Sequence, residues 1–388
     1  MDKIEQILNI PLVGKDTNFW MIRAKRGFFF DEFIRNEYIA IGWNSIVKSM
    51  IDQKLTSDQA NQIKESIKET YNDNRPGMAF NKCIRFCSEI KVGDIAVIVD
   101  NSRVAFAYIG EYYEDMSSEF TVELEKDIHR RIEKANPNID TFDCPYIKRR
   151  KISLIKMLST DDTISPYLQS AIARNWHSLS DLNEYAELIL SGCFDAFIFK
   201  EKLTVTFRVK RKEDINVLDL ANFVLPAARL LSDDEPETVS VKTTLHSPGD
   251  ILLQISNFTQ ENLSSVLVCW WAIFGAKIQG CEFNSVLGVI KNIINYKYNK
   301  EKKKLELRLL AAEANKVEQE VLAKKLDNIE KMQKLQLATA EECATKLAEA
   351  AQNLEVQPSM QIDGNVIDLI KFQEIQSQDQ KTNTSINI

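Results

Sequence analysis

Residues 19–43 read FWMIRAKRGFFFDEFIRNEYIAIGW, and residues 90–99 read IKVGDIAVIV. Short runs of aromatic and β-branched residues predict β-strands. We expect four strands from this pattern, around Trp20 and over residues 38–42, 94–99 and 103–110. Aromatic rings interleaved with basic side chains on such strands are typical of a domain that binds a nucleobase or another flat ligand, rather than of a catalytic domain.

Helices are expected between these strands and after them. Helices are predicted over 30–36, 57–71 and 79–89, the second of which is polar. Apolar residues spaced by three and four predict two more over 164–172 and 179–190. Ser57 is the expected N-cap of the second helix, because its hydroxyl can accept a backbone N–H. After Arg149-Arg150-Lys151-Ile152 the pattern becomes helical, so we expect these later helices to close the first domain.

At the start of the second half of the chain, the spacing of the apolar residues changes from about four residues to two. Leu203, Val205, Phe207 and Val209 alternate with polar residues, which predicts a half-buried strand. A helix over 217–231 and a hairpin formed by 239–245 and 251–255 follow, which makes a β-α-β-β unit. The most apolar run, 263–275, is shorter than the roughly 20 residues that cross a bilayer, so a buried helix is expected.

Residues 296–354 contain no proline or glycine and are dense in Lys, Glu, Ala and Leu. This composition predicts a helix of about 80 Å at about 1.5 Å rise per residue. A heptad seam of apolar residues is formed by Leu310, Ala314, Val317 and Val321, and its register shifts further along the chain. This pattern indicates an irregular coiled coil and self-association. The alternative is a single solvated helix packed on its own protein.

The fold class predicted from these elements is α+β. It combines an N-terminal barrel with helices, a small β-α-β-β domain and a long C-terminal helix or coiled coil. The expected domains are a helix and linker over 1–17, a first domain over 18–195, an α+β domain with the apolar helix over 196–295, the long helix over 296–355 and a mostly disordered tail over 356–388.

The charge balance restricts how the chain could bind nucleic acid. Its 388 residues hold 49 Lys and Arg against 56 Asp and Glu, a formal net charge of −7. This excludes a protein that coats nucleic acid with a surface that is basic throughout, so any binding of DNA or RNA must come from a local basic patch. The hydrophobic content of 44% is that of a folded protein, and the length suffices for two or three domains.

Common catalytic and metal-binding patterns are missing from the sequence. Seven scattered cysteines without a C-x-x-C pair, and a first segment unlike a signal peptide, favour a reducing cytoplasm. Cys83, Cys87, Cys144 and His129 lack the paired spacing of zinc sites, which favours buried free thiols. The nearest match to a magnesium nuclease motif, at Asp195, lacks a spacer residue. We therefore expect no catalytic residue, metal ligand or cofactor.

The first domain resembles the EVE/PUA-like module at the N-terminus of Mrr-like predicted restriction endonucleases, over residues 18–190. The matching segments are Trp20-Met21-Ile22-Arg23-Ala24 with Gly27, Phe33, Ile39-Ala40-Ile41-Gly42-Trp43, Arg85-Phe86, Ile90-Lys91-Val92-Gly93-Asp94, Ile109-Gly110-Glu111-Tyr112-Tyr113 and Arg149-Arg150-Lys151-Ile152. The resemblance implies a small β-barrel that recognises modified or flipped bases in DNA or RNA, in prokaryotic anti-phage defence. The second half is loosely similar to uncharacterised bacterial proteins found near defence genes.

Eight residues are the candidates for nucleic-acid binding. A base lifted from its stack needs flat walls and a few donors. The candidate walls are Trp20, Phe28, Trp43 and Tyr112, and the candidate donors are Arg23, Lys25, Arg26 and Arg85. Packing in the core is the alternative for Trp20 and Trp43, and a solvated surface position is the alternative for Arg23.

The sequence thus favours a non-catalytic sensor or adaptor that binds DNA or RNA in anti-phage defence. Its expected partners are nucleic acid, a second copy of the chain and a protein bound through the long helix. One alternative is a membrane-acting effector that inserts residues 263–283, which the lack of a positive cluster just before this run disfavours. Another alternative is a divergent nuclease whose site has no recognisable motif.

Overall fold

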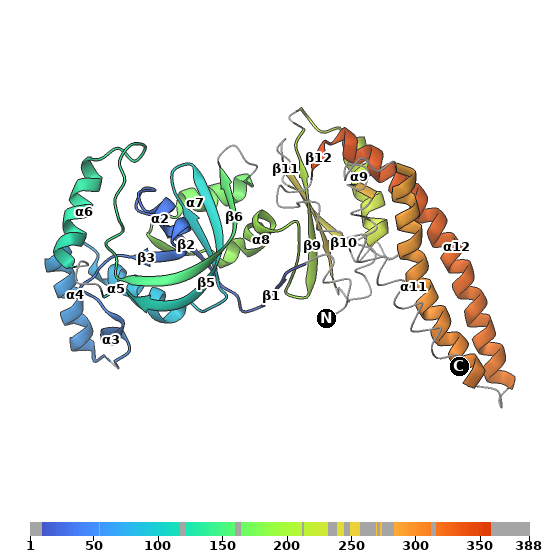
Figure 1. Cartoon of the computed structure of the whole chain (residues 1–388), viewed down its shortest axis with the longest axis horizontal. Coiled ribbons are helices and arrows are strands. Elements are labelled where there is room, and N and C mark those ends of the chain that lie inside the picture. Colours follow the sequence, from blue (N-terminus) through green and yellow to red (C-terminus); the bar gives the residue numbers. More distant parts are fainter. Residues whose placement is uncertain are drawn as a thin grey trace. The chain divides into compact units, whose positions relative to one another are not determined.

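The computed structural model describes residues 10–53, 55–116, 121–159, 164–211, 213–231, 239–243, 249–256, 269, 272–273, 283–311 and 316–357. The chain divides into two compact units. The N-terminal unit spans Gly14–Cys193, and the C-terminal unit holds Met1–Val13 and Phe194–Ile388. Both units combine helices with a mixed sheet, which confirms the predicted α+β class (Figure 1).

The N-terminal unit is built on a six-stranded sheet in the order β3-β6-β5-β4-β2-β7. Its strands are β2 (Phe19–Arg23), β3 (Tyr38–Ile41), β4 (Ile95–Val99), β5 (Arg103–Glu114), β6 (Lys148–Ser159) and β7 (Leu179–Asp181). Among the described strands of this sheet, only β2 and β4 pair in parallel, with Trp20 opposite Ala96. The described strands leave β3 and β7 at opposite edges of the sheet, which curves into half of a barrel (Figure 1).

Helices pack around this sheet and close its core. They are α2 (Phe30–Arg35), α3 (Lys48–Ile51), α4 (Ser57–Tyr71), α5 (Pro76–Ile84) with a π-helical turn (Arg85–Glu89), α6 (Val122–Lys134), α7 (Pro166–Arg174) and α8 (Ala186–Cys193). The core gathers aromatic rings such as Phe29 and Phe33, which are fully buried. The N-cap of α4 is Thr56 rather than the predicted Ser57, because Thr56 forms a reciprocal capping box with Gln59.

The end of this unit is only partly as predicted, since α7 confirms the helix expected over 164–172. The helical pattern expected from residue 152 onward is wrong for its first part, because residues 148–159 form the 12-residue strand β6 between β3 and β5. Its first residues are charged but buried, because Lys148 donates hydrogen bonds to two backbone carbonyls and Arg150 to four. The helix predicted over 179–190 is instead strand β7, a short 3-10 turn (Asn183–Tyr185) and α8.

The C-terminal unit has its own six-stranded sheet, in the order β1-β8-β9-β11-β10 with β12 also paired to β9. The strands are β1 (Leu12–Val13), β8 (Ala196–Phe199), β9 (Lys202–Val209), β10 (Val239–Thr243), β11 (Gly249–Ile255) and β12 (Val356–Gln357). The helix α9 (Val217–Leu231) and the β10–β11 hairpin confirm the predicted β-α-β-β unit. Strand β8, which the sequence analysis missed, adds to one side of β9.

The long helical stretch is divided between α11 (Phe283–Ala311) and α12 (Lys316–Asn353). Three side-chain pairs join the two helices: Lys291 with Glu341 at 3.1 Å, Gln333 with Asn295 at 2.9 Å, and Lys302 with Glu330. The helices are antiparallel, because the residue numbers rise on one as they fall on the other. A long C-terminal helix is confirmed by α12, whereas one uninterrupted helix over 296–354 is wrong. Pairing within the chain buries an apolar stripe that a lone helix would expose.

Three predicted segments fall wholly or largely outside the described residues. They are the helix of the predicted N-terminal segment 1–17, expected over residues 2–10, the apolar run 263–283 except for residues 269, 272, 273 and 283, and the tail beyond residue 357. Among the described helices, none combines the length and the apolar character that a membrane span requires.

Candidate functional site: a cationic aromatic cavity

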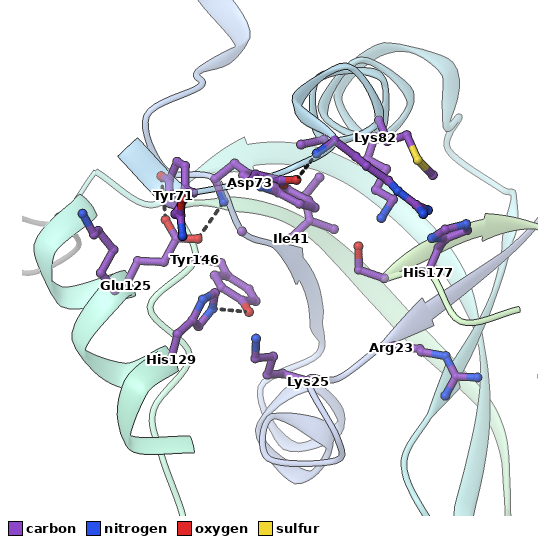
Figure 2. A pocket seen from close by; sticks show the side chains of 18 of the residues that line it. Arg23, Lys25, Ile41, Tyr71, Asp73, Lys82, Glu125, His129, Tyr146 and His177 are labelled. Atoms are coloured by element: carbon purple, nitrogen blue, oxygen red, sulfur yellow. Dashed lines mark hydrogen bonds between the residues drawn. The ribbon is translucent and has the colours of Figure 1, made fainter. Parts of the chain in front are cut away.

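A cavity of about 840 Å³ opens in the N-terminal unit (Figure 2). Segments far apart in the sequence line it, namely the ends of β2 and β3, the α4–α5 junction, one face of α6 and the loop before β7. The lining residues used below are Arg23, Lys25, Arg26, Gly42, Trp43, Tyr71, Asp73, Arg75, Lys82, Glu125, Lys126, His129, Arg130, Glu133, Tyr146, Trp176, His177 and Ser178.

One wall of the cavity depends on Glu125, a buried carboxylate on α6 that is only 1% exposed. It accepts hydrogen bonds from the backbone N–H of Trp43 at 2.7 Å, from the N–H of Asn44 at 2.8 Å and from Tyr71 Oη at 2.9 Å. A β-carbon on Gly42 would lie 2.6 Å from Glu125 Oε1, so only glycine lets the chain pass this close. Glu125 thereby fixes the loop that presents the Trp43 ring.

The loop at Trp43 is held in a strained conformation. Trp43 has a φ of 62°, a left-handed value that costs a residue with a β-carbon about 1–3 kcal/mol unless its surroundings impose it. Lys148 Nζ donates to the Trp43 carbonyl oxygen at 2.7 Å, which holds the loop opposite Glu125. Lys82 Nζ lies 5.5 Å from the centre of the Trp43 ring, within cation–π range. The ring is therefore a fixed, half-buried aromatic surface beside a cation.

A second corner of the cavity combines an imidazole, a phenol and an ammonium group. His129 Nε2 lies 2.9 Å from Tyr146 Oη. Burial, with a smaller contribution from the charge of Lys25, lowers the pKa of His129 to about 4, so the ring is neutral near pH 7. Burial leaves the Lys25 amine poorly hydrated, and this loss of hydration lowers its pKa. A poorly hydrated cation gains more from a bound anion than a solvated one does.

Lys25 and Arg26 occupy a left-handed turn directly after β2. Their φ values are 46° and 58°, and Gly27 follows at 90°. A β-carbon on Gly27 would approach Asp100 Cβ to 3.0 Å, so this turn needs a glycine both for its φ and for space. The turn brings both basic residues to the cavity lining.

Arg23 holds the loop before β7 in place through hydrogen bonds. Its Nε donates to the Asn175 carbonyl oxygen at 2.9 Å and its Nη2 to the Ile172 carbonyl oxygen at 2.7 Å. Its backbone N–H donates to the Ser178 carbonyl oxygen at 3.0 Å. These bonds hold both sides of Trp176, whose side chain is 83% exposed.

The cavity lining is strongly basic. It contains seven Arg and Lys residues, namely Arg23, Lys25, Arg26, Arg75, Lys82, Lys126 and Arg130, against three carboxylates at Asp73, Glu125 and Glu133. The whole chain, by contrast, has a net charge of −7. Figure 2 places Tyr71, Glu125, His129 and Tyr146 on one side of the cavity, with Lys82, His177 and Arg23 on the other. The site thus suits a ligand with a flat apolar part and negative charge.

Four of the eight sequence-predicted residues line this cavity, namely Arg23, Lys25, Arg26 and Trp43. The other four do not. Trp20 is buried and donates from Nε1 to Asp94 Oδ2 at 2.9 Å, and Phe28 packs edge-to-face on Phe142. Arg85 pairs with Glu89, and Tyr112 donates to Glu114 at 2.7 Å.

Several residues that build the cavity were not predicted from the sequence, namely Tyr71, Lys82, Glu125, His129, Tyr146 and Trp176. Glu125 and His129 are four residues apart on an amphipathic helix, which is a signal for a shared face. Trp176 stands next to His177 in a polar loop, where an isolated tryptophan suggests a contact surface. Among the described residues, no group of three or more His, Cys, Asp or Glu side chains could hold a metal ion.

Comparison with known families matches residues 21–131 to a domain of unknown function (DUF8426). This range runs from β2 into α6 and contains most of the residues that line the cavity. No curated protein and no solved structure matches the chain.

Proposed function

We propose that the N-terminal unit binds nucleic acid without catalysing a reaction, by taking a base into the cavity and surrounding the neighbouring phosphates with cations. The observation that carries this proposal is the excess of basic side chains around the cavity, seven against three carboxylates, in a chain of net charge −7. Such a local patch attracts a polyanion that the protein as a whole would repel.

The shape and lining of the cavity support a base as the inserted group. Pockets of about 300–1,000 Å³ hold small ligands, and 840 Å³ lies within this range. Trp43, Tyr71 and Tyr146 supply aromatic surfaces, and stacking contributes about 1–3 kcal/mol for each base. Trp43 is held by Glu125 and Lys148 before any ligand arrives, so little ordering cost remains for binding.

The wider role follows from the sequence analysis. We propose a cytoplasmic sensor or adaptor in prokaryotic anti-phage defence, with a modified base as one ligand that the cavity could select. The C-terminal unit would contribute self-association or a protein partner through α11 and α12. These parts of the proposal rest on the resemblance and on the composition of the chain.

The test is binding of the full chain to labelled single- and double-stranded DNA and RNA, modified and unmodified, followed by fluorescence anisotropy at about 50 mM and about 200 mM salt. We expect salt-sensitive binding that Lys82→Ala weakens, with a smaller slope of log affinity against log salt because one phosphate contact is lost. Lys68→Ala is the matched control, because Lys68 is exposed on α4 and outside the cavity lining.

Two results would refute this proposal. One is a wild-type chain that binds no nucleic acid under any of these conditions. The other is binding that Lys82→Ala and Lys68→Ala change by the same factor, because the cavity would then contribute no more than any surface charge.

A further inference from the structure

The loop before β7 presents a tryptophan to solvent in a fixed position. Trp176 is 83% exposed, although burial is the default for so large an aromatic side chain. Its neighbours Asn175 and Ser178 are both hydrogen-bonded to Arg23, and the Asn175 amide donates to the Ala171 carbonyl oxygen at 2.8 Å. The ring therefore stands at the cavity lining on an anchored backbone.

Three basic side chains line the cavity together with this tryptophan. Arg75, Lys82 and His177 all line the cavity, and Figure 2 shows Lys82 and His177 on the same side of it. Burial and the charges of Lys82 and Arg75 together lower the pKa of His177, so both cations lie near an imidazole that is neutral around pH 7. A bound anion would offset the charges of Lys82 and Arg75, and the imidazole could donate a hydrogen bond to it.

We infer that the ligand is a single-stranded segment of at least two nucleotides. One base enters the cavity, the adjacent base stacks on Trp176, and Arg75, Lys82 and His177 hold the phosphate between them. This inference rests on the proposed function and names the form of nucleic acid that the site takes.

The two alternatives within the same chemistry fit the exposed ring less well. A mononucleotide has no second base, so Trp176 would add nothing to its binding. In a duplex, both inserting one base and freeing its neighbour for the indole require unpairing and unstacking, at a cost of a few kcal/mol. An unpaired strand offers a free base face next to the inserted nucleotide, and such stacking is worth about 1–3 kcal/mol.

The experiment compares three probes on the full chain: a nucleoside 5′-monophosphate, an unstructured tetranucleotide and a blunt duplex. We expect Trp176→Ala to weaken tetranucleotide binding by about 5- to 150-fold, which is the affinity equivalent of that stacking energy, and to leave mononucleotide binding unchanged. Trp176→Phe should retain most of the tetranucleotide affinity. Tyr167→Ala is the matched control, because Tyr167 is a 60% exposed aromatic on α7 outside the cavity lining.

Each of the other possible results refutes one part of this inference or the proposed function itself. If Trp176→Ala leaves tetranucleotide binding unchanged, or weakens both single-stranded and mononucleotide probes equally, the second stacking position is refuted while the cavity proposal stands. If the duplex binds as tightly as the tetranucleotide, the preference for an unpaired strand is refuted. If the wild-type chain binds none of the probes, the proposed function itself fails.

Discussion

Replacing Glu125 with alanine removes the acceptor on which one wall of the cavity depends. The carboxylate accepts hydrogen bonds from the backbone N–H groups of Trp43 and Asn44 and from the phenol of Tyr71. A buried donor left without a partner costs about 1–3 kcal/mol. The substitution leaves two backbone donors unpaired, whereas the Tyr71 hydroxyl can rotate. We therefore expect Glu125→Ala to lower the free energy of unfolding of the N-terminal unit by about 2–6 kcal/mol.

The effect of this substitution on binding separates positioning from simple charge. Removing a carboxylate from a site that attracts phosphates should strengthen binding if only charge matters. We expect Glu125→Ala to weaken binding instead, because the Trp43 loop loses its anchor. Glu133→Ala is the matched control: Glu133 lines the same cavity from the same helix, is exposed, and lies two turns further on. Its loss should leave stability unchanged and strengthen binding slightly.

The stability of the N-terminal unit can be followed in the full chain by hydrogen exchange, using peptides that cover residues 38–46, and binding by anisotropy. Glu125→Gln keeps the shape of the side chain and one carbonyl acceptor, so it should show a smaller loss in both assays if Glu125→Ala proves too unstable to study. A loss of less than about 1 kcal/mol in Glu125→Ala, the range of ordinary surface substitutions, would refute the anchoring role. Tighter binding of the kind expected for Glu133→Ala would refute it as well.

Three further outcomes are expected. His129 has a pKa of about 4 in the folded chain and about 6.5 when unfolded, so the free energy of unfolding should fall by up to about 3 kcal/mol as the pH drops from 6.5 to 4. His129→Gln should flatten this dependence of stability on pH in denaturant titrations, and an unchanged dependence would show that His129 is not its source. Gly42→Ala should destabilise the unit by about 1–3 kcal/mol through its clash with the anchoring carboxylate, whereas Gly77→Ala, whose β-carbon meets nothing within 4 Å, should not. Cysteines at Asn295 and Gln333 should form a disulfide within one chain on a non-reducing gel, and disulfide-linked dimers would show that the helices pair between chains.

The fold could be predicted where local patterns and burial agree. The alternation from Leu203 to Val209 and the periodic stretch 217–231 match the bounds of β9 and α9 closely, because the apolar residues of both patterns pack into one core. The prediction that this strand is half-buried is wrong, because its polar residues Thr204, Thr206 and Arg208 are buried as well. Strand β6 was missed because Lys148 and Arg150 carry charge yet lie inside, their heads satisfied by carbonyls of distant segments. Such long-range bonds leave no signal in the sequence around them.

The division of the long helical stretch could not be predicted for a related reason. Residues 296–354 favour helix throughout, so propensity alone gives no reason to fold back. The apolar residues of α12 instead find their partners on α9 and α11, as the burial of Ala344, Leu347 and Ala351 shows. Tertiary packing, and not local preference, decides how this segment is arranged.

Part of the cavity lining could be predicted from the sequence. Composition indicates that aromatic and basic residues after β2 and β3 face a ligand, and Lys25, Arg26 and Trp43 do line the cavity. The rest of the lining comes from α6 and from the loop at Trp176, which are brought to the same place only by the tertiary fold.

The basic residues that line the cavity differ in their contacts, although the sequence gives no reason to distinguish them. This difference leads to a last prediction, about Arg23. Its guanidinium is occupied by the carbonyls of Ile172 and Asn175, so we expect it to act on the ligand through Trp176 rather than by direct contact. In that case Arg23→Ala should weaken tetranucleotide binding in the wild-type background and have little further effect in a Trp176→Ala background. Equal effects in both backgrounds, measured by anisotropy, would instead assign Arg23 a direct contact with phosphate. Lys25→Ala provides the comparison: Lys25 belongs to the opposite corner of the cavity, beside His129, so its effect should add to that of Trp176→Ala.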